Sequence, residues 1–152
     1  MINLESSTVI NRPVEEVFAF VTDMERRPQW MSGVEELRWT SDGPPRVGST
    51  FRTVRRAMGR RMESDSVLTA YEPNSKYSYK TTGGPFSMEV TATFEAVQDG
   101  TEYRVFAQGG LSGVFTIVAP VLGRMVKRDL ETDLSNLKDL LERGPESDAT
   151  GQ

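Results

Sequence analysis

Apolar residues recur at helical spacing near the end of the chain. Four leucines follow one another at steps of four, three and four residues: Leu130, Leu134, Leu137 and Leu141. This spacing places them on one face of an amphipathic helix. Charged residues between them are expected on the other faces: Arg128, Glu131, Asp133, Lys138 and Asp139. Glycine and proline at 144 and 145 are typical of a helix stop, so the pattern predicts one helix over 113–143 and a disordered tail over 145–152.

The first half of this predicted helix is apolar on nearly every side. Residues 113–126 carry no charge before Arg124, and a helix that is apolar all round must be covered by other parts of the protein. The run is well short of the roughly 20 residues that a membrane-spanning helix needs, so no stable membrane insertion is expected. Pro120 removes a backbone donor and predicts a kink or a new helix start.

The start of the chain predicts a strand and then a helix. Residues 2–10 alternate in the manner of a strand. Pro13 suits the first position of a helix that ends near Asp23, and either Asn11 or Arg12 could cap it.

A second, shorter helical turn is predicted over 25–31. It carries Trp30 and Met31 to an apolar surface. Arg26 and Arg27 belong to the same stretch, and such a pair is more often a solvated charge cluster than a ligand clamp.

From residue 34 to 109 the pattern changes to a period of two, which predicts about six antiparallel strands. Short turns between strands fix which residues face each other. The predicted turns are Met58-Gly59, Glu72-Pro-Asn-Ser75, Gly83-Gly84 and Asp99-Gly100. They place four pairs opposite each other: Arg52 with Asp65, Leu68 with Tyr79, Tyr79 with Met88, and Phe94 with Val105.

All four turns give the same alternation of side chains, which predicts two different faces of one sheet. The inner face collects apolar and hydroxyl side chains with one arginine: Phe51, Thr53, Arg55, Met62, Ser64, Ser66, Leu68, Ala70, Tyr77, Tyr79, Thr81, Phe86, Met88, Val90, Ala92, Phe94, Ala96, Tyr103, Val105 and Ala107. The outer face collects charges: Arg52, Glu63, Asp65, Lys80, Glu89, Glu95, Glu102 and Arg104. One helix can cover a curved sheet of this size without filling its concave face, so a cavity is expected.

Four motifs occur in order along the chain. They are Pro13-Val-Glu-Glu-Val-Phe18, Pro28-Gln-Trp30, Val47-Gly-Ser-Thr-Phe51 and Leu134-Ser-Asn-Leu-Lys-Asp-Leu-Leu-Glu142. Together with the order of elements, they resemble the polyketide cyclase/dehydrase branch of the START and Bet v 1-like (SRPBCC) superfamily over nearly the whole chain.

The resemblance implies a single α+β domain over residues 1–144 with a helix-grip fold. In this fold a long C-terminal helix lies across a curved seven-stranded antiparallel sheet, two short helices connect the first two strands, and a ligand cavity lies between sheet and helix. Members include carriers of hydrophobic ligands, lipid-transfer domains and aromatase/cyclases, so the fold alone leaves the function open.

Composition narrows the chemistry. The chain has 152 residues, a net charge of −4, and neither cysteine nor histidine. Disulfides, thiol nucleophiles, the usual zinc sites and imidazole acid–base schemes are therefore excluded. The negative charge argues against nucleic-acid binding, and no motif implies a metal or other cofactor. Without a predicted signal peptide we expect a cytoplasmic protein, either a monomer or a weak homodimer.

Residues predicted to line the cavity and bind a hydrophobic small molecule come from the sheet and from the helical side. From the sheet they are Phe51, Thr53, Arg55, Ser64, Ser66, Leu68, Tyr77, Tyr79, Phe86, Met88, Phe94 and Tyr103. From the helical side they are Phe18, Trp30, Phe115, Val118, Leu122 and Met125. Large apolar residues at helical spacing are more often core than ligand contacts.

The inward polar residues allow two interpretations. A buried phenol usually anchors core packing, and for Tyr77, Tyr79 and Tyr103 this role is favoured over a ligand role. Two serines at alternate inner positions, Ser64 and Ser66, are less expected in a core unless the space is wet or holds a polar ligand.

Arg55 is the most informative candidate. An inward guanidinium must be paired, reach solvent at the rim, or bind an anion, and a position close to the hairpin turn favours the rim. With Arg56, Arg60 and Arg61 it forms a basic hairpin tip. Such a tip could clamp a carboxylate or phosphate, but is more often a solvated cluster.

No carboxylate belongs to the predicted inner face, and Glu63 and Asp65 are interpreted as outer-face partners of Arg52. This weakens every hydrolase hypothesis.

Three hypotheses about function remain. The favoured one is binding or transport of a lipid, isoprenoid or polyketide without chemistry. The second is a polyketide cyclase, aromatase or dehydratase in which Arg55 polarises a carbonyl and a tyrosine exchanges a proton. The third is a partner-binding regulatory module that exposes segment 114–126.

Overall fold

The computed structural model describes residues 2–57, 59–84, 87–110 and 119–150. Its elements, in chain order, are β1 (Ile2–Ile10), α1 (Val14–Thr22), the 3-10 helix η1 (Met24–Gln29), β2 (Val34–Trp39), β3 (Thr50–Ala57), β4 (Arg60–Glu72), β5 (Lys76–Gly83), β6 (Ser87–Val97), β7 (Gly100–Gly110) and α2 (Ala119–Thr150).

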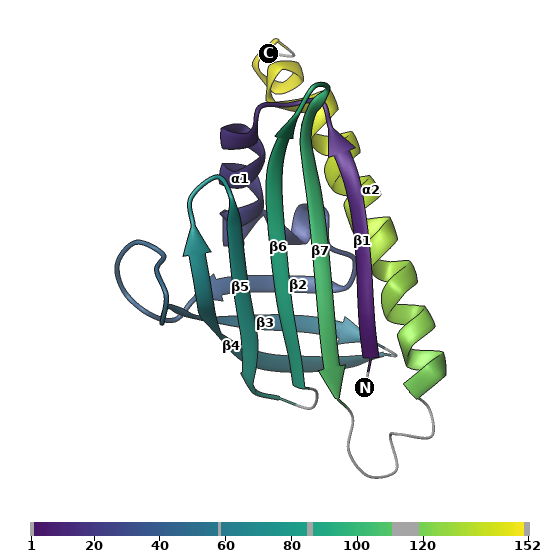
Figure 1. Cartoon of the computed structure of the whole chain (residues 1–152). Coiled ribbons are helices and arrows are strands. Elements are labelled where there is room, and N and C mark those ends of the chain that lie inside the picture. Colours follow the sequence, from purple (N-terminus) through teal and green to yellow (C-terminus); the bar gives the residue numbers. More distant parts are fainter. Residues whose placement is uncertain (1, 58, 85–86, 111–118, 151–152) are drawn as a thin grey trace.

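The strands form one curled antiparallel sheet of seven strands in the order β1-β7-β6-β5-β4-β3-β2. In Figure 1, β5, β6, β7 and β1 stand side by side, and α2 lies along β1. β2, β3 and the first part of β4 cross behind them, and β4 then bends to run beside β5. The predicted helix-grip architecture is confirmed, with α1 and η1 as the two short helices between the first two strands. No helix among the described residues is long and apolar enough to cross a membrane.

Two of the four predicted registers are confirmed. Arg52 faces Asp65 across the β3–β4 hairpin, and Leu68 faces Tyr79 between β4 and β5. The first pair agrees with the predicted glycine turn at 59, because Gly59 has a φ of 74°, a conformation that favours glycine.

The other two registers are shifted by two residues. Tyr79 faces Val90 instead of Met88, because a longer connection than two residues joins β5 to β6. Phe94 faces Tyr103 instead of Val105, since Val97 already pairs with Gly100. Gly100 is the first residue of β7; a Cβ there would collide with the Ile10 carbonyl, and its φ of 136° also favours glycine. A shift of two preserves the side-chain alternation, and both faces keep their composition.

A β-bulge changes one inner-face assignment. The register of β4 shifts between Leu68 and Ala70, so that Ala70 pairs with Ser78 and Tyr71 pairs with Tyr77. Tyr71 takes the inward position predicted for Ala70, and its ring lies 5.7 Å from that of Phe18. Bulges of this kind add one residue to a strand and invert its alternation beyond that point.

The helix ends differ from the expectations. Pro13 is the N-cap of α1 and no side chain caps the helix, so neither Asn11 nor Arg12 does so. The Arg12 side chain donates to the Leu141 carbonyl over 2.9 Å and to the Glu142 carbonyl over 3.1 Å.

These two bonds explain why the predicted stop at 144 and 145 is wrong. A proline at 145 cannot donate to the carbonyl four residues earlier, that of Leu141. The Arg12 guanidinium supplies a donor there instead, and α2 continues to Thr150. Pro120 lies in the first turn of α2, which agrees with a new helix start; residues 113–118 lie outside the described residues.

Candidate ligand-binding site

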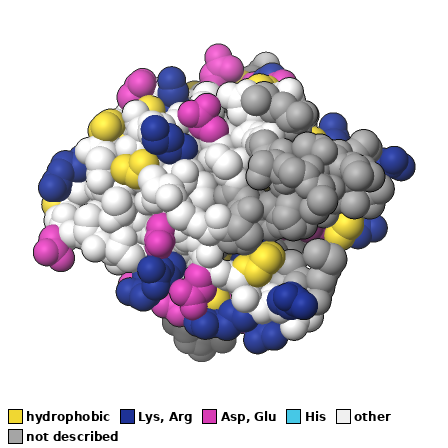
Figure 2. All heavy atoms as spheres, turned by 90° about the horizontal axis from the view of Figure 1, so that it is seen from below, with side chains coloured by type: hydrophobic (Ala, Val, Ile, Leu, Met, Phe, Trp, Pro, Cys, Tyr) yellow, Lys and Arg dark blue, Asp and Glu magenta, His cyan; other side chains and the backbone are white. Residues whose placement is uncertain are grey.

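The concave face of the sheet changes character along its length. We call its buried part the closed end, formed by Phe18 of α1 and the inward residues Tyr77, Ala92, Phe94 and Tyr103. We call its half-buried part the open end, formed by the inward residues Met62, Ser64, Tyr79, Thr81, Met88 and Val90. Figure 2 looks from below, where β7 ends and α2 begins, and shows hydrophobic side chains between charged ones of both signs.

A continuous row of aromatic rings joins the two ends. The ring of Phe94 lies 4.9 Å from that of Phe18 and 5.0 Å from that of Tyr103. Tyr77 stacks on Tyr79 at 6.1 Å, and Phe51 continues the row at 5.1 Å from Tyr79. Apart from the tyrosine hydroxyls, this surface is suited to flat or extended apolar molecules.

Arg27 is a buried guanidinium at the closed end, and the sequence interpretation of a solvated charge was wrong. Only 2% of the residue is exposed. Its Nε donates to the Val21 carbonyl over 2.7 Å, and its Nη2 donates to the Tyr77 hydroxyl over 2.6 Å. The remaining nitrogen, Nη1, lies 3.6 Å from the sulfur of Met31.

The partners of Arg27 are uncharged. Its Cζ lies 5.4 Å from the ring centre of Trp30 and 5.5 Å from that of Tyr77, and no described carboxylate forms an ion pair with it. Burial lowers the pKa of Arg27, but the oxygens of Tyr77, Tyr103 and Tyr79 outweigh that effect and leave the pKa above its ordinary value. The interior therefore holds a fixed positive charge, which is costly unless it is well compensated.

The phenols of Tyr79 and Tyr103 remain protonated at neutral pH. Burial raises the pKa of Tyr103 well above its ordinary value, and the polar contact with Tyr77 raises it further. Burial also raises the pKa of Tyr79, although Arg27 and Arg55 oppose the shift. These groups are thus hydrogen-bond donors and acceptors rather than bases.

Trp30 contributes a second unusual donor. The residue is 3% exposed, and its indole Nε1 is buried without a hydrogen-bond partner among the described residues. Its main-chain carbonyl accepts from Asn136 of α2 over 3.3 Å, which holds η1 against the helix. The ring position is therefore set by packing, while the N–H group is unsatisfied.

Asp133 brings a carboxylate into the interior from α2, contrary to the expectation that it faces solvent. It is 5% exposed and accepts from the Ser32 backbone N–H over 2.8 Å. The reason is helical spacing, because position 133 follows Leu130 by three residues and precedes Leu137 by four. Burial raises the pKa of Asp133, and the bond from Ser32 and the charge of Arg55 oppose that shift.

Arg55 is half-buried on the inward side of β3, opposite Met62. It lies near enough to Asp133 and Tyr79 to influence the pKa of each. Elsewhere on the basic hairpin, Arg56 pairs with Glu35 at 2.7 Å and Arg61 pairs with Glu63 at 2.7 Å. These exposed ion pairs agree with a solvated cluster at the tip.

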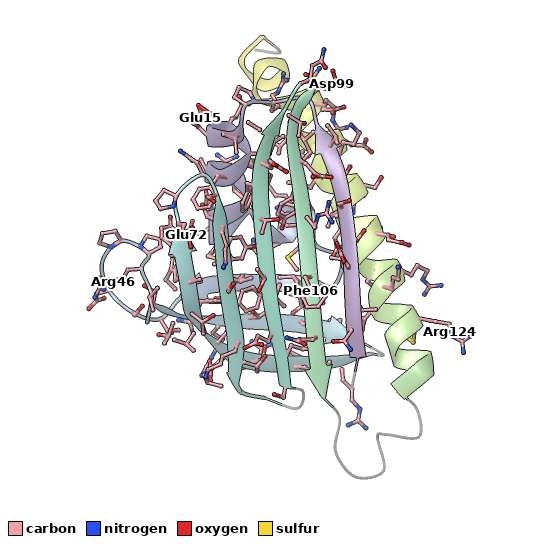
Figure 3. The ribbon with its side chains drawn as sticks, viewed as in Figure 1. Glu15, Arg46, Glu72, Asp99, Phe106 and Arg124 are labelled. Carbon is pink, nitrogen blue, oxygen red and sulfur yellow. The ribbon has the colours of Figure 1, made fainter. Side chains whose placement is uncertain are left out.

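The other predicted site residues divide into three groups. Phe51, Thr53, Ser66 and Leu68 are buried. Met125 is 37% exposed and lies outside the buried cluster, close to Arg124, which points away from the sheet in Figure 3. The side chains of Phe86, Phe115, Val118 and Leu122 lie outside the described part. Glu63 and Asp65 bind Arg52 at 3.4 and 2.9 Å as predicted.

A separate groove of about 560 Å³ lies where α2 meets the end of β1. Lys138 donates to the Val9 carbonyl over 2.6 Å and pairs with Glu142 at 2.7 Å, so its charged groups already serve helix docking. Asp99, which also lines it, marks the β6–β7 turn at the top of Figure 3. Within the described ranges, no three carboxylates gather in a way that could hold a metal ion.

The chain belongs to the family described as polyketide cyclase / dehydrase and lipid transport, whose sequence model matches residues 1–142. A curated relative is 28% identical over 149 residues, which cover 97% of this chain and 95% of the relative. It is an uncharacterized 17.2 kDa protein from the melC2–rnhH intergenic region of Streptomyces lincolnensis.

Solved structures agree on the fold. A protein from Thermus thermophilus aligns with a TM-score of 0.79 and 19% identity, over 90% of this chain and 94% of that one. The Zhui aromatase/cyclase from Streptomyces sp. R1128 aligns with a TM-score of 0.76 and 14% identity, over 93% of both chains. At such identities the likeness shows the fold alone.

Proposed function

We propose that this protein binds a hydrophobic or amphipathic small molecule between the concave face of the sheet and α2. The change of burial along the concave face is the observation that supports this most directly. At the closed end the rings pack against one another, whereas Tyr79, Met88 and Val90 at the open end face inward and stay half-buried. An inward-facing apolar surface that the fold leaves partly uncovered is suited to a ligand.

Apolar contact alone would give only weak binding. A ligand that covers about 300 Å² of apolar surface gains roughly 7 kcal/mol, from which the cost of association is subtracted. Micromolar binding therefore needs additional polar contacts or a larger covered area. The hydroxyls of Ser64 and Thr81 at the open end offer such contacts.

A cyclase or dehydratase acting on a polyketide is the second candidate. The pairing of Arg27 with Tyr77 favours it, because a cation behind a phenol can polarise a carbonyl and supply a proton. The raised pKa values of Tyr79 and Tyr103 count against a phenolate base at neutral pH. Binding without chemistry therefore remains our first proposal.

Native mass spectrometry of protein purified from its own host tests the proposal. We expect a stoichiometric mass increment, and a released compound of apolar or amphipathic character after denaturing extraction. Protein that is empty, and that binds none of a panel of fatty acids, isoprenoids and aromatic polyketides, would contradict it. Turnover of a polyketide that Tyr77→Phe abolishes without loss of binding would favour the second candidate.

A further inference from the structure

We propose that Arg27 and the indole N–H of Trp30 form the anchor for the carboxylate of an amphipathic ligand. The inference rests on the proposed function and specifies its ligand as an acid whose charged end lies at the closed end of the concave face. Its basis is the set of hydrogen-bond donors that the folded chain leaves without acceptors.

Arg27 has more donors than strong acceptors. A guanidinium carries five N–H bonds, whereas the oxygen acceptors around it within the described residues are the Val21 carbonyl and the hydroxyls of Tyr77 and Tyr79. Nη1 contacts the Met31 sulfur at 3.6 Å, and a thioether is a weak acceptor. The five N–H groups therefore outnumber the oxygen acceptors, and a better acceptor than the Met31 sulfur could bind at Nη1.

Trp30, which lies beside Arg27, also has a hydrogen-bond donor without a described acceptor. Its ring lies against the guanidinium at 5.4 Å, and its buried N–H has no described acceptor. Buried donors are almost always satisfied in folded proteins. Two neighbouring side chains that both need acceptors point to a missing partner rich in oxygen.

The positive charge of Arg27 favours a ligand whose oxygen atoms are negatively charged. The buried carboxylate of Asp133 is bound to the Ser32 N–H and does not form an ion pair with Arg27. An anionic ligand would therefore supply the negative charge that the described interior does not bring to this guanidinium. Arginine binds carboxylates through two parallel N–H bonds, which gives both strength and orientation.

Met31 is the side chain that the ligand carboxylate would displace to reach Arg27. It is half-buried and covers Nη1, and an unbranched thioether adapts easily to a new neighbour. When Met31 moves aside, a carboxylate can take the place of its sulfur. The apolar part of the ligand then follows the stacked rings of Tyr77 and Tyr79 toward the open end.

The test compares matched ligands and matched variants. Isothermal titration with 2-naphthoate and methyl 2-naphthoate, and with dodecanoate and dodecanol, separates the acid from the neutral compound on the same skeleton. We expect the acids to bind about 10- to 100-fold more tightly than their neutral partners. Arg27→Met should abolish that preference and leave neutral binding intact. Arg26→Met is the control, because the Arg26 side chain is 51% exposed, and should keep the preference.

A second measurement does not depend on an arginine variant. The indole N–H resonance of Trp30, assigned with Trp30→Phe, should move downfield when 2-naphthoate binds and stay in place with the methyl ester. Equal binding of acid and neutral compound, or a preference that survives in folded Arg27→Met, overturns the anchor but leaves the proposed function standing. Absence of binding by every compound counts against the proposed function itself.

Discussion

Arginines on the convex face of the sheet and the arginine inside it are neutralised in different ways. Arg52 pairs with Asp65 at 2.9 Å, and Arg104 pairs with Glu5 at 2.7 Å, all on exposed side chains. Arg27, by contrast, has phenols, a carbonyl and a sulfur around it. The convex face is also where Phe106, 39% exposed, lies on β7 (Figure 3).

The difference is informative because the charge that most needs compensation, the buried one, has no carboxylate partner among the described residues. Exposed ion pairs contribute little, since water already solvates each charge. A buried charge needs compensation far more. This chain pairs surface arginines with carboxylates, but in the part that the structure describes its buried arginine has only neutral partners. An anionic ligand beside Arg27 accounts for that arrangement better than stability alone does.

The largest effect is expected when the interior arginine is truncated. Arg27→Ala removes a buried stem and leaves a cavity, so the free energy of unfolding should fall by about 2–4 kcal/mol. Arg27→Met fills much of the same space but leaves the Val21 carbonyl and the Tyr77 hydroxyl without their donor, so its loss should be smaller than that of Arg27→Ala but measurable. Urea unfolding of both variants measures this. Equal large losses would mean that the charge itself stabilises the fold.

Removal of the Arg27 partner should have the next largest effect. Tyr77→Phe leaves a buried guanidinium N–H without its acceptor and should lower the free energy of unfolding by about 1–3 kcal/mol. Tyr71→Phe is the matched control, because that ring is also inward but half-buried, and should change stability less. In the Arg27→Met background, Tyr77→Phe should cost less than in wild type, as a double-mutant cycle would show.

The two faces should respond to pH with opposite signs. Asp133 has a raised pKa, so its contribution to stability is present below its ordinary value of 3.8 and is lost as pH rises through the folded-state value. Asp65 has a pKa lowered by Arg52, so its contribution is present above 3.8 and is lost as pH falls through the folded-state value.

Denaturant unfolding between pH 3 and 7, roughly the range in which carboxylates titrate, checks these signs. Relative to wild type, Asp133→Asn should gain stability as pH rises, and Asp65→Asn should lose it. The asparagine at 133 keeps an oxygen for the Ser32 N–H, so the bond to the loop is retained. Parallel pH profiles for the two variants would refute the contrast between interior and surface.

The smallest effect is expected at the surface. Arg52→Met breaks exposed pairs with Asp65 and Glu63 and should change Tm less than Arg27→Ala or Tyr77→Phe. Added salt should reduce the difference further, because it screens exposed charges. Thermal unfolding at low and high salt gives the comparison, and a salt-insensitive loss would show that Arg52 acts through packing.

Much of the fold could be predicted because alternation is a local property. The period of two separated Tyr77 and Tyr79 from Lys80, and every inward residue of β5 follows from it. Errors of register, as between Tyr79 and Val90, came from the length of a connection, which alternation does not record. The bulge beside Ala70 had no counterpart in the pattern, since an extra residue in a strand is stabilised by its neighbours.

The candidate site was predicted in part. The tyrosines and Phe94 were found from alternation, but Arg27 was missed, because Arg26 and Arg27 are adjacent charges in a polar run. Successive residues of a 3-10 turn point in directions about 120° apart, so one of two identical residues faces inward and composition cannot say which. Asp133 could have been found, since its spacing from Leu130 and Leu137 places it beside the apolar face.

Periodicity and turn residues along the chain were thus enough for the order of elements, the two faces of the sheet and most of its inward side chains, because these depend on neighbours in sequence. The bulge that puts Tyr71 inward in place of Ala70 is the exception. The burial of Arg27 against Tyr77, fifty residues away, and the passage of α2 beyond Leu141 with help from Arg12 needed the folded protein. Both rest on a donor and an acceptor from distant segments, and such pairs are set by how the sheet curls and where the helix docks.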